Sequence, residues 1–200
     1  MARKVTISKE VILENALNML IRDGYSSINI KTLAAEIGCS TQPLVWHFEN
    51  MEGLRNALAV YAREYAEKKA LPKNKKTILS AVDVFENLGK SYVKMAIKEP
   101  NLFKFLYLGE SPLSTPYKLK DISSGKEGGI GKEMIAGIAA ETGLSEEQIS
   151  RCVGNTVIYA HGIATMIATG VFKASEKDVN LMIKKASESF LKSEMESKNE

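Results

Sequence analysis

Side chains able to act as acids, bases, nucleophiles or metal ligands are scarce in this sequence and lie far apart. The 200 residues include two histidines, His47 and His161, and two cysteines, Cys39 and Cys152. No pair among them has the spacing of a metal site or of a nucleophile beside its base. We therefore expect no metal and no cofactor, and we interpret the cysteines as small buried apolar residues.

The glycine-rich stretch GKEGGIGKE, residues 125–133, is similar to a phosphate-binding loop only superficially. Lys126 stands where that loop needs its first glycine, and Glu133 replaces the serine or threonine that would contact Mg²⁺. The stretch also follows no predicted strand. We predict that the chain is not an enzyme.

Three residues instead have the spacing of a helix-turn-helix, a motif that presents polar side chains to DNA. Ala34 is the small residue where two helices cross, Gly38 occupies the tight turn, and Leu44 anchors the second helix. Phe48 lies four residues after Leu44 and shares its inward face. The side chains expected to project outward from the second helix are Thr41, Gln42, Trp46 and His47.

Helical periodicity predicts four helices around this motif, each beginning at a residue whose side chain can cap the free N–H groups of the first turn. These predicted caps are Ser8, Asn29, Ser40 and Asn50. Gly24 and Gly38 end the first two helices, Pro43 falls in the first turn of the third, and the fourth runs to about Ala70.

The rest of the chain also has helical periodicity, without an alternating strand pattern or an internal repeat. The expected helices are Thr77–Lys98, Asn101–Leu108, Ile130–Thr142, Ser145–Thr169 and Ser175–Met195. Segment 109–129, rich in proline, glycine and serine, is expected to be a loop. The predicted fold class is all-α with about nine helices: a DNA-binding domain at 1–50, a connecting helix at 51–70, and a second domain at 71–200.

The stretch from Gly24 to Leu54 resembles the N-terminal domain of the TetR/AcrR family of bacterial regulators. The matching residues are Gly24-Tyr25, Ile30-Lys31, Leu33-Ala34, Gly38-Cys39-Ser40, Leu44 and Phe48. A weaker pattern at 85–107 looks like the start of the family's sensor domains. The resemblance implies a homodimer built on the last two helices, which pack as a four-helix bundle. It also implies recognition helices in successive major grooves of operator DNA, about 34 to 36 Å apart.

The resemblance also implies which side chains would contact DNA. Gln42 can pair in bidentate fashion with adenine, and Thr41 suits a phosphate or a thymine methyl. Trp46 suits the sugar-phosphate backbone or a thymine methyl, or equally a contact with a neighbouring helix, and His47 is either a phosphate donor or a polar surface residue. Further candidates are Arg3 and Lys4 as a minor-groove arm or a disordered end, Lys31 and Thr32 as phosphate contacts, and Ser40 and Pro43.

Two positions depart from the family pattern. Val45 stands where the family usually has a phosphate-contacting tyrosine, and Met51 where it usually has a lysine. We therefore predict that affinity for DNA falls less steeply with salt than in a relative that has both residues, unless other cations compensate.

The second domain is rich in aromatic residues and methionines, which suit a ligand cavity or simply a core. Tyr92, Tyr159 and His161 can supply orienting hydrogen bonds, although His161 equally suits a core or interface position. The candidate lining residues are Phe85, Leu88, Tyr92, Met95, Phe103, Leu106, Tyr107, Met134, Tyr159, His161 and Met166. Such a lining favours a hydrophobic or aromatic effector.

The resemblance implies a ligand-responsive regulator, by default a repressor that a small hydrophobic effector releases from its operator. The alternative is a dimeric helical module that binds small molecules or proteins and has weakened or lost operator recognition. The net charge of +3 permits DNA binding without arguing for it. Apolar runs are too short to cross a bilayer and the N-terminus lacks a signal-peptide pattern, so we expect a cytoplasmic protein without a membrane segment.

Overall fold

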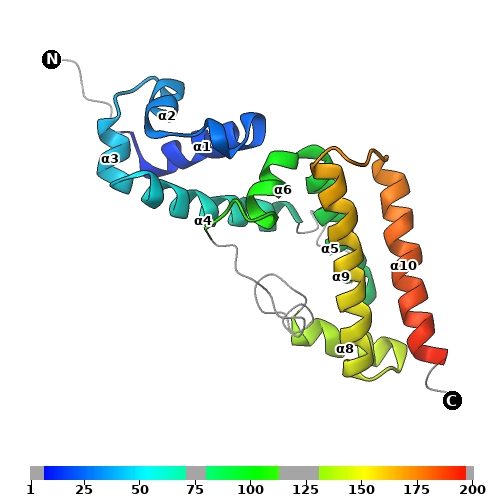
Figure 1. Ribbon diagram of the computed structural model, residues 1–200. Coiled ribbons are helices and arrows are strands. Elements are labelled where there is room, and N and C mark those ends of the chain that lie inside the picture. Colours follow the sequence, from blue (N-terminus) through cyan, green and yellow to red (C-terminus); the bar gives the residue numbers. More distant parts are fainter. Residues whose placement is uncertain (1–6, 71–79, 113–130, 197–200) are drawn as a thin grey trace. The chain divides into compact units, whose positions relative to one another are not determined.

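The computed structural model describes residues 7–70, 80–112 and 131–196, which form helices and no strand (Figure 1). The chain divides into two compact units. The first comprises Met1–Lys68 and Glu99–Thr115, and the second comprises Lys69–Lys98 and Pro116–Glu200. Within the three described ranges, no helix is both long and apolar enough to cross a membrane.

The first unit contains a helix-turn-helix and the helices that support it. Its elements are α1 (Lys9–Asp23), η1 (Tyr25–Ser27), α2 (Ile30–Ile37), α3 (Gln42–Phe48), most of α4 (Met51–Ala70) and α6 (Pro100–Tyr107). Three predicted caps are confirmed. Ser8 Oγ accepts from Val11 N–H at 3.3 Å, Asn29 Oδ1 accepts from two N–H groups of α2, and Asn50 Oδ1 accepts from Gly53 N–H at 3.0 Å.

The predicted cap at Ser40 is wrong. Helix α3 begins at Gln42, its flanking residue is Thr41, and neither Ser40 nor Thr41 caps it with a side-chain hydrogen bond. A side-chain cap usually accepts from the N–H of the second or third helical residue. Pro43 occupies the second position and has no N–H, which removes one of these two donors.

Helix α6 belongs to the first unit, although the sequence pattern assigned residues 101–108 to the second domain. The side-chain amide of Asn101 donates to the Ile21 carbonyl at the end of α1 at 3.2 Å. The rings of Tyr25 and Phe105 stack with their centroids 5.1 Å apart. Phe103 and Phe105 are fully buried, so α6 is part of the core of this unit.

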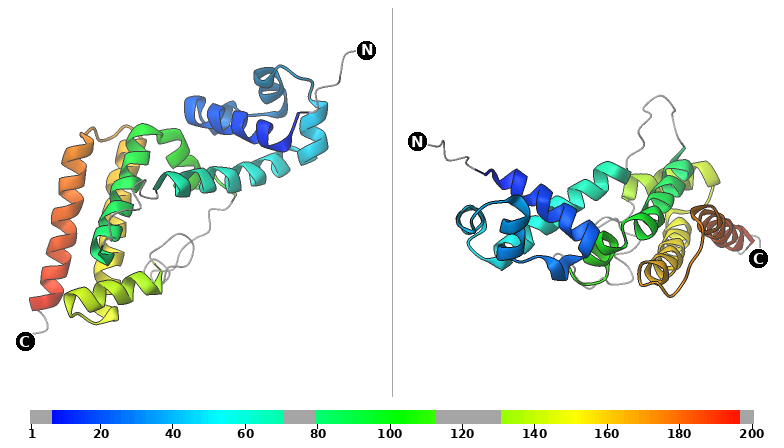
Figure 2. Two further views of the ribbon diagram at one scale, coloured as in Figure 1. Left: turned by 180° about the vertical axis from the view of Figure 1, so that it is seen from behind. Right: turned by 90° about the horizontal axis from the view of Figure 1, so that it is seen from above.

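The second unit contains α5 (Ala81–Lys98), α8 (Lys132–Thr142), α9 (Glu146–Ala168) and α10 (Glu176–Glu196). Helices α9 and α10 lie side by side in all views, and α9 also packs against α5 (Figures 1 and 2). A buried cluster fills the contact of α8 with α9 and consists of Ile135, Ile138, Leu144, Ile149 and Val153.

Helix α5 begins at Ala81, later than the predicted Thr77, and residues 77–79 lie outside the described ranges. The Glu141 carboxylate of α8 accepts from Ala81 N–H at 2.7 Å and Val82 N–H at 3.3 Å. A carboxylate on free N–H groups stabilises the start of a helix through hydrogen bonds and the helix dipole. A distant residue therefore caps α5.

The junction of α3 with α4 is a tight three-residue turn at Glu49, which has φ 65° and ψ −53°. Asn50 N–H donates to the Phe48 carbonyl at 2.7 Å, which closes a strained γ-turn. The next helix passes very close to this carbonyl, since a Cβ on Gly53 would lie 2.1 Å from Phe48 O. Only glycine at position 53 permits this approach.

We expect Gly53→Ala to destabilise the first unit by about 1 to 3 kcal/mol, because the added methyl group must displace backbone. Gly89→Ala is the control: its Cβ would lie 3.9 Å from Ile183 Cγ2, an ordinary contact. Removing a helical glycine there should be neutral or stabilise the second unit by up to about 1 kcal/mol. Calorimetric unfolding of both variants checks the difference, and equal stability of Gly53→Ala and the parent chain would contradict it.

Candidate DNA-binding and effector sites

The helix-turn-helix has the geometry that its spacing predicts. Gly38 is in the left-handed conformation, with φ 75° and ψ 35°, and Cys39 N–H donates to the Ala34 carbonyl at 2.9 Å. Leu44 and Phe48 are 0% and 4% exposed, and α3 packs against both α1 and α2. One face of α3 is therefore anchored in the core.

The opposite face of α3 is open to solvent. Thr41 and Gln42 are exposed, as predicted for residues that would contact DNA. Trp46 is 73% exposed, which excludes a buried contact with a neighbouring helix of this unit. Val45, which the sequence pattern marked only by the absence of a tyrosine, precedes Trp46 and is 48% exposed. Ser40 is exposed as well, and Pro43 is half-buried.

His47 is turned inward rather than outward. Its Nε2 lies 2.9 Å from the carbonyl oxygen of Ile7, just before α1, and the side chain is half-buried. The ring also lies edge-on to Trp46, with centroids 4.5 Å apart. His47 therefore ties the start of α1 to α3 and supports the indole, which the sequence pattern did not reveal.

The first turn of α2 offers fewer free donors than predicted. The N–H groups of Lys31 and Thr32 both donate to Asn29 Oδ1 at 2.9 Å, and the Thr32 hydroxyl donates to the Ser27 carbonyl at 2.8 Å. Lys31 is exposed, so its ammonium group is the free candidate for a phosphate contact in this turn. Arg3 and Lys4 lie outside the described residues.

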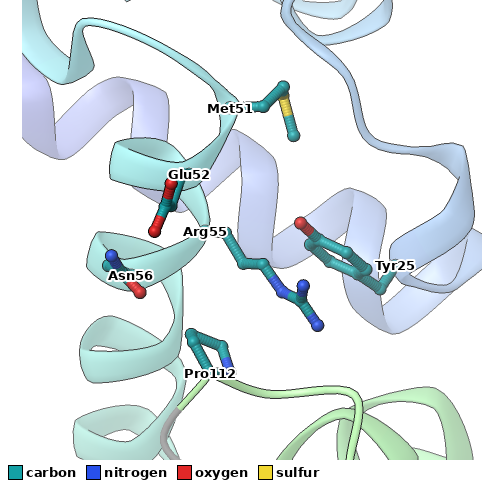
Figure 3. Close-up of a pocket in the computed structure, with 6 residues that line it drawn as sticks. All are labelled: Tyr25, Met51, Glu52, Arg55, Asn56 and Pro112. Carbon is teal, nitrogen blue, oxygen red and sulfur yellow. The ribbon is translucent and has the colours of Figure 1, made fainter.

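A pocket of about 380 Å³ lies at the start of α4, and the sequence did not indicate it (Figure 3). Figure 3 shows Arg55 reaching toward the Tyr25 ring, while Glu52 and Asn56 point away from it. The residues that line the pocket are Tyr25, Met51, Glu52, Arg55, Asn56 and Pro112. Met51, at the position where the resemblance implies a lysine, is half-buried in this wall.

Arg55 joins three parts of the first unit. Its guanidinium lies 5.0 Å from the centre of the Tyr25 ring, within the range of a cation–π contact, and also donates to the Glu110 carbonyl beyond α6. Burial raises the pKa of Tyr25, and the positive charge of Arg55 opposes that shift. The arginine thereby fastens η1 and the segment after α6 to α4.

The predicted effector-lining residues are divided between the two units. Phe103 and Leu106 are buried in the first unit, where Tyr107 is 38% exposed. In the second unit, Phe85 and Met134 pack against the buried cluster at the contact of α8 with α9. The other residues lie on α5 and α9: Leu88, Tyr92, Met95 and His161 are half-buried, and Tyr159 and Met166 are exposed.

Tyr92 and His161 are the two predicted polar residues that the structure brings together. The Tyr92 hydroxyl lies 2.5 Å from His161 Nδ1, between α5 and α9. Burial lowers the pKa of His161, which favours the neutral ring. In the neutral ring, an unprotonated Nδ1 accepts a hydrogen bond from the tyrosine hydroxyl, so the pair satisfies both groups inside the second unit.

We expect the free energy of unfolding to fall as the pH drops below about 6.5. His161 then becomes protonated in the unfolded chain but stays neutral in the folded chain, where its pKa is lowered. The effect should level off once the pH passes the lowered pKa of the folded state. His161→Gln should remove this part of the pH dependence, whereas Tyr92→Phe should retain it because burial is its cause. Urea unfolding of the parent chain and both variants between about pH 7.5 and 5 measures how the free energy of unfolding depends on pH. An unchanged dependence in His161→Gln would disprove the assignment.

Comparison with known sequences finds relatives of part of the first unit. Residues 12–58 match the family described as bacterial regulatory proteins, tetR family. The chain is also 37% identical over 59 residues to the uncharacterized HTH-type transcriptional regulator Rv0681 of Mycobacterium tuberculosis. That alignment covers 30% of this chain and spans 27% of the length of the relative.

Comparison with solved structures extends over nearly the whole chain. A protein of unknown function from Rhodococcus sp. RHA1 has a TM-score of 0.70 at 21% identity, covering 96% of this chain and 98% of that one. A TetR variant from Acinetobacter baumannii in complex with minocycline has a TM-score of 0.56 at 15% identity, covering 94% and 98%. Mycobacterium smegmatis BioQ has a TM-score of 0.55 at 13% identity, covering 92% and 98%. The N-terminal part of the chain is therefore similar to bacterial regulatory proteins of the tetR family, and its overall fold is similar to that of these three solved structures.

Proposed function

We propose that the chain is a dimeric DNA-binding regulator of transcription, a repressor that a small hydrophobic effector releases from its operator. The observation that carries this proposal is the two-sided character of α3. Leu44 and Phe48 anchor one side, and the exposed Gln42 and Trp46 occupy the other. A helix held in this way can enter the major groove while its two anchoring side chains stay buried in the first unit.

The test begins with the full chain and a library of random DNA duplexes, from which a preferred site is selected. Gln42→Ala should then bind that site about 10- to 100-fold more weakly, because a bidentate contact with one base is lost. Binding to unrelated duplexes should not change, since phosphate contacts remain.

Val60→Ala is the control, because Val60 is exposed on α4 outside the helix-turn-helix. A failure to select any site, or an equal loss of affinity in Val60→Ala, would count against the proposal.

We place the dimer interface on α9 and α10, the last two helices. Ile158, Tyr159 and Met166 are exposed apolar residues of α9. Gly162 lies between Ile158 and Met166 at helical spacing. Apart from its chain neighbours and the nearby backbone of its own helix, no atom of the described residues lies within 4 Å of a Cβ built there. Leu181 of α10 is half exposed as well. Such an apolar stripe is typical of a surface that a second subunit covers.

Ile158→Lys should convert the dimer to monomers, because a charged side chain would be buried at the interface. Val60→Lys is a matched control: both parent residues are 50% exposed, and Val60 belongs to the other unit. Analytical ultracentrifugation of the two variants and the parent chain measures their oligomeric states. A monomeric parent chain, or a dimeric Ile158→Lys variant, would exclude this interface.

The proposed effector site lies in the second unit. Helix α5 contributes the half-buried Phe85, Leu88 and Met95, and the Tyr92–His161 pair supplies a hydrogen-bonding group among them. The Acinetobacter structure of the same fold holds minocycline, which supports a small-molecule ligand. An effector can release DNA only if it binds the two conformational states of the regulator with different affinity.

A second candidate function is a dimeric helical module with weakened or lost operator recognition, binding small molecules or proteins. Val45 and Met51 favour it, because neither side chain can contact phosphate as tyrosine and lysine would. Sequence-specific binding that weakens with salt distinguishes the regulator from this module. A module without operator recognition would show no preferred duplex.

A further inference from the structure

We infer that Val45 and Trp46 form an apolar reading surface on α3 that recognises thymine methyl groups in each operator half-site. This inference rests on the proposed function, because it names the base chemistry that α3 would read. It also gives Val45 a role of its own, as a specificity-determining residue rather than a lost phosphate contact.

The two residues lie on the outward face beside the predicted adenine reader. Gln42, Val45 and Trp46 are related by three and four positions, so they share one face of the helix. Val45 is 48% exposed and Trp46 is 73% exposed. The family match at residues 12–58 includes all three positions. Their surface is therefore continuous with the proposed DNA contact.

Neither residue is needed for the core of the first unit. Leu44 and Phe48 supply the buried side chains of α3. The exposed indole and valine instead leave adjoining apolar surface in water, which is unfavourable in proportion to its area. This surface is also held in place, because Trp46 rests edge-on against His47, whose Nε2 bonds to Ile7 O. A supported apolar surface of this kind fits a ligand group that is itself apolar.

The major groove offers one apolar group to such a surface, the C5 methyl of thymine. Valine has no hydrogen-bonding group, so placing it against the polar edge of guanine, cytosine or adenine would desolvate donors and acceptors without replacing their bonds. Gln42 suits adenine, the base that pairs with thymine. A·T pairs therefore satisfy the amide and the apolar side chains together.

The test uses the duplex selected by the full chain, with each thymine replaced in turn by deoxyuridine, which lacks only the methyl group. At the thymines that Val45 and Trp46 contact, we expect affinity to fall about three- to tenfold, the range for burying one or two methyl-sized groups. Val45→Ala and Trp46→Ala should each bind the thymine duplex more weakly and lose their sensitivity to one of these replacements.

Val60→Ala is the matched control, since it is the same substitution at a valine of nearly equal exposure, 50% against 48%. It should retain full sensitivity to deoxyuridine, and circular dichroism confirms that each variant is folded. A selected duplex in which no thymine methyl matters would overturn the inference while leaving the proposed function intact. The inference would also be overturned if both Val45→Ala and Trp46→Ala kept their full sensitivity to the deoxyuridine replacements. If no duplex is selected at all, both the inference and the proposed function fail.

Discussion

The burial of Leu44 and Phe48 is the interaction on which the outward surface of the first unit depends. Helix α3 has seven residues, too few to be stable in water by itself. Its conformation is held because these two side chains are inserted against α1 and α2. The positions of Gln42, Val45 and Trp46 follow from that anchorage, so one short helix has both a buried anchoring face and an exposed face.

The junction with α4 adds a second constraint. Glu49 adopts a backbone conformation that is strained for a residue with a side chain, and the absence of a side chain at Gly53 lets α4 approach the Phe48 carbonyl. A flexible linker would let α3 and α4 reorient independently. This turn instead fixes the direction in which one helix leaves the other, so a movement of α4 is passed to α3 by backbone geometry.

The sequence predicted those features that depend on neighbours in the chain. Periodicity and capping residues identified the helices, and the spacing around Gly38 identified the turn. Features that depend on tertiary contacts were missed or misplaced, including the bond of His47 to Ile7, the position of Arg55 and the unit to which α6 belongs. Apolar periodicity reveals that a residue such as Phe103 is buried, but not which core it joins.

The assignment of α6 to the first unit gives the backbone an unusual route. Because 1–68 and 99–115 form one unit and 69–98 and 116–200 the other, the polypeptide passes between them three times. The units are therefore joined by three covalent tethers. Two of these tethers are the ends of the segment that Asn101, Phe105 and Arg55 fasten to α1, η1 and α4. The core of the first unit is therefore completed by contacts between residues far apart in the sequence, and such long-range contacts slow folding.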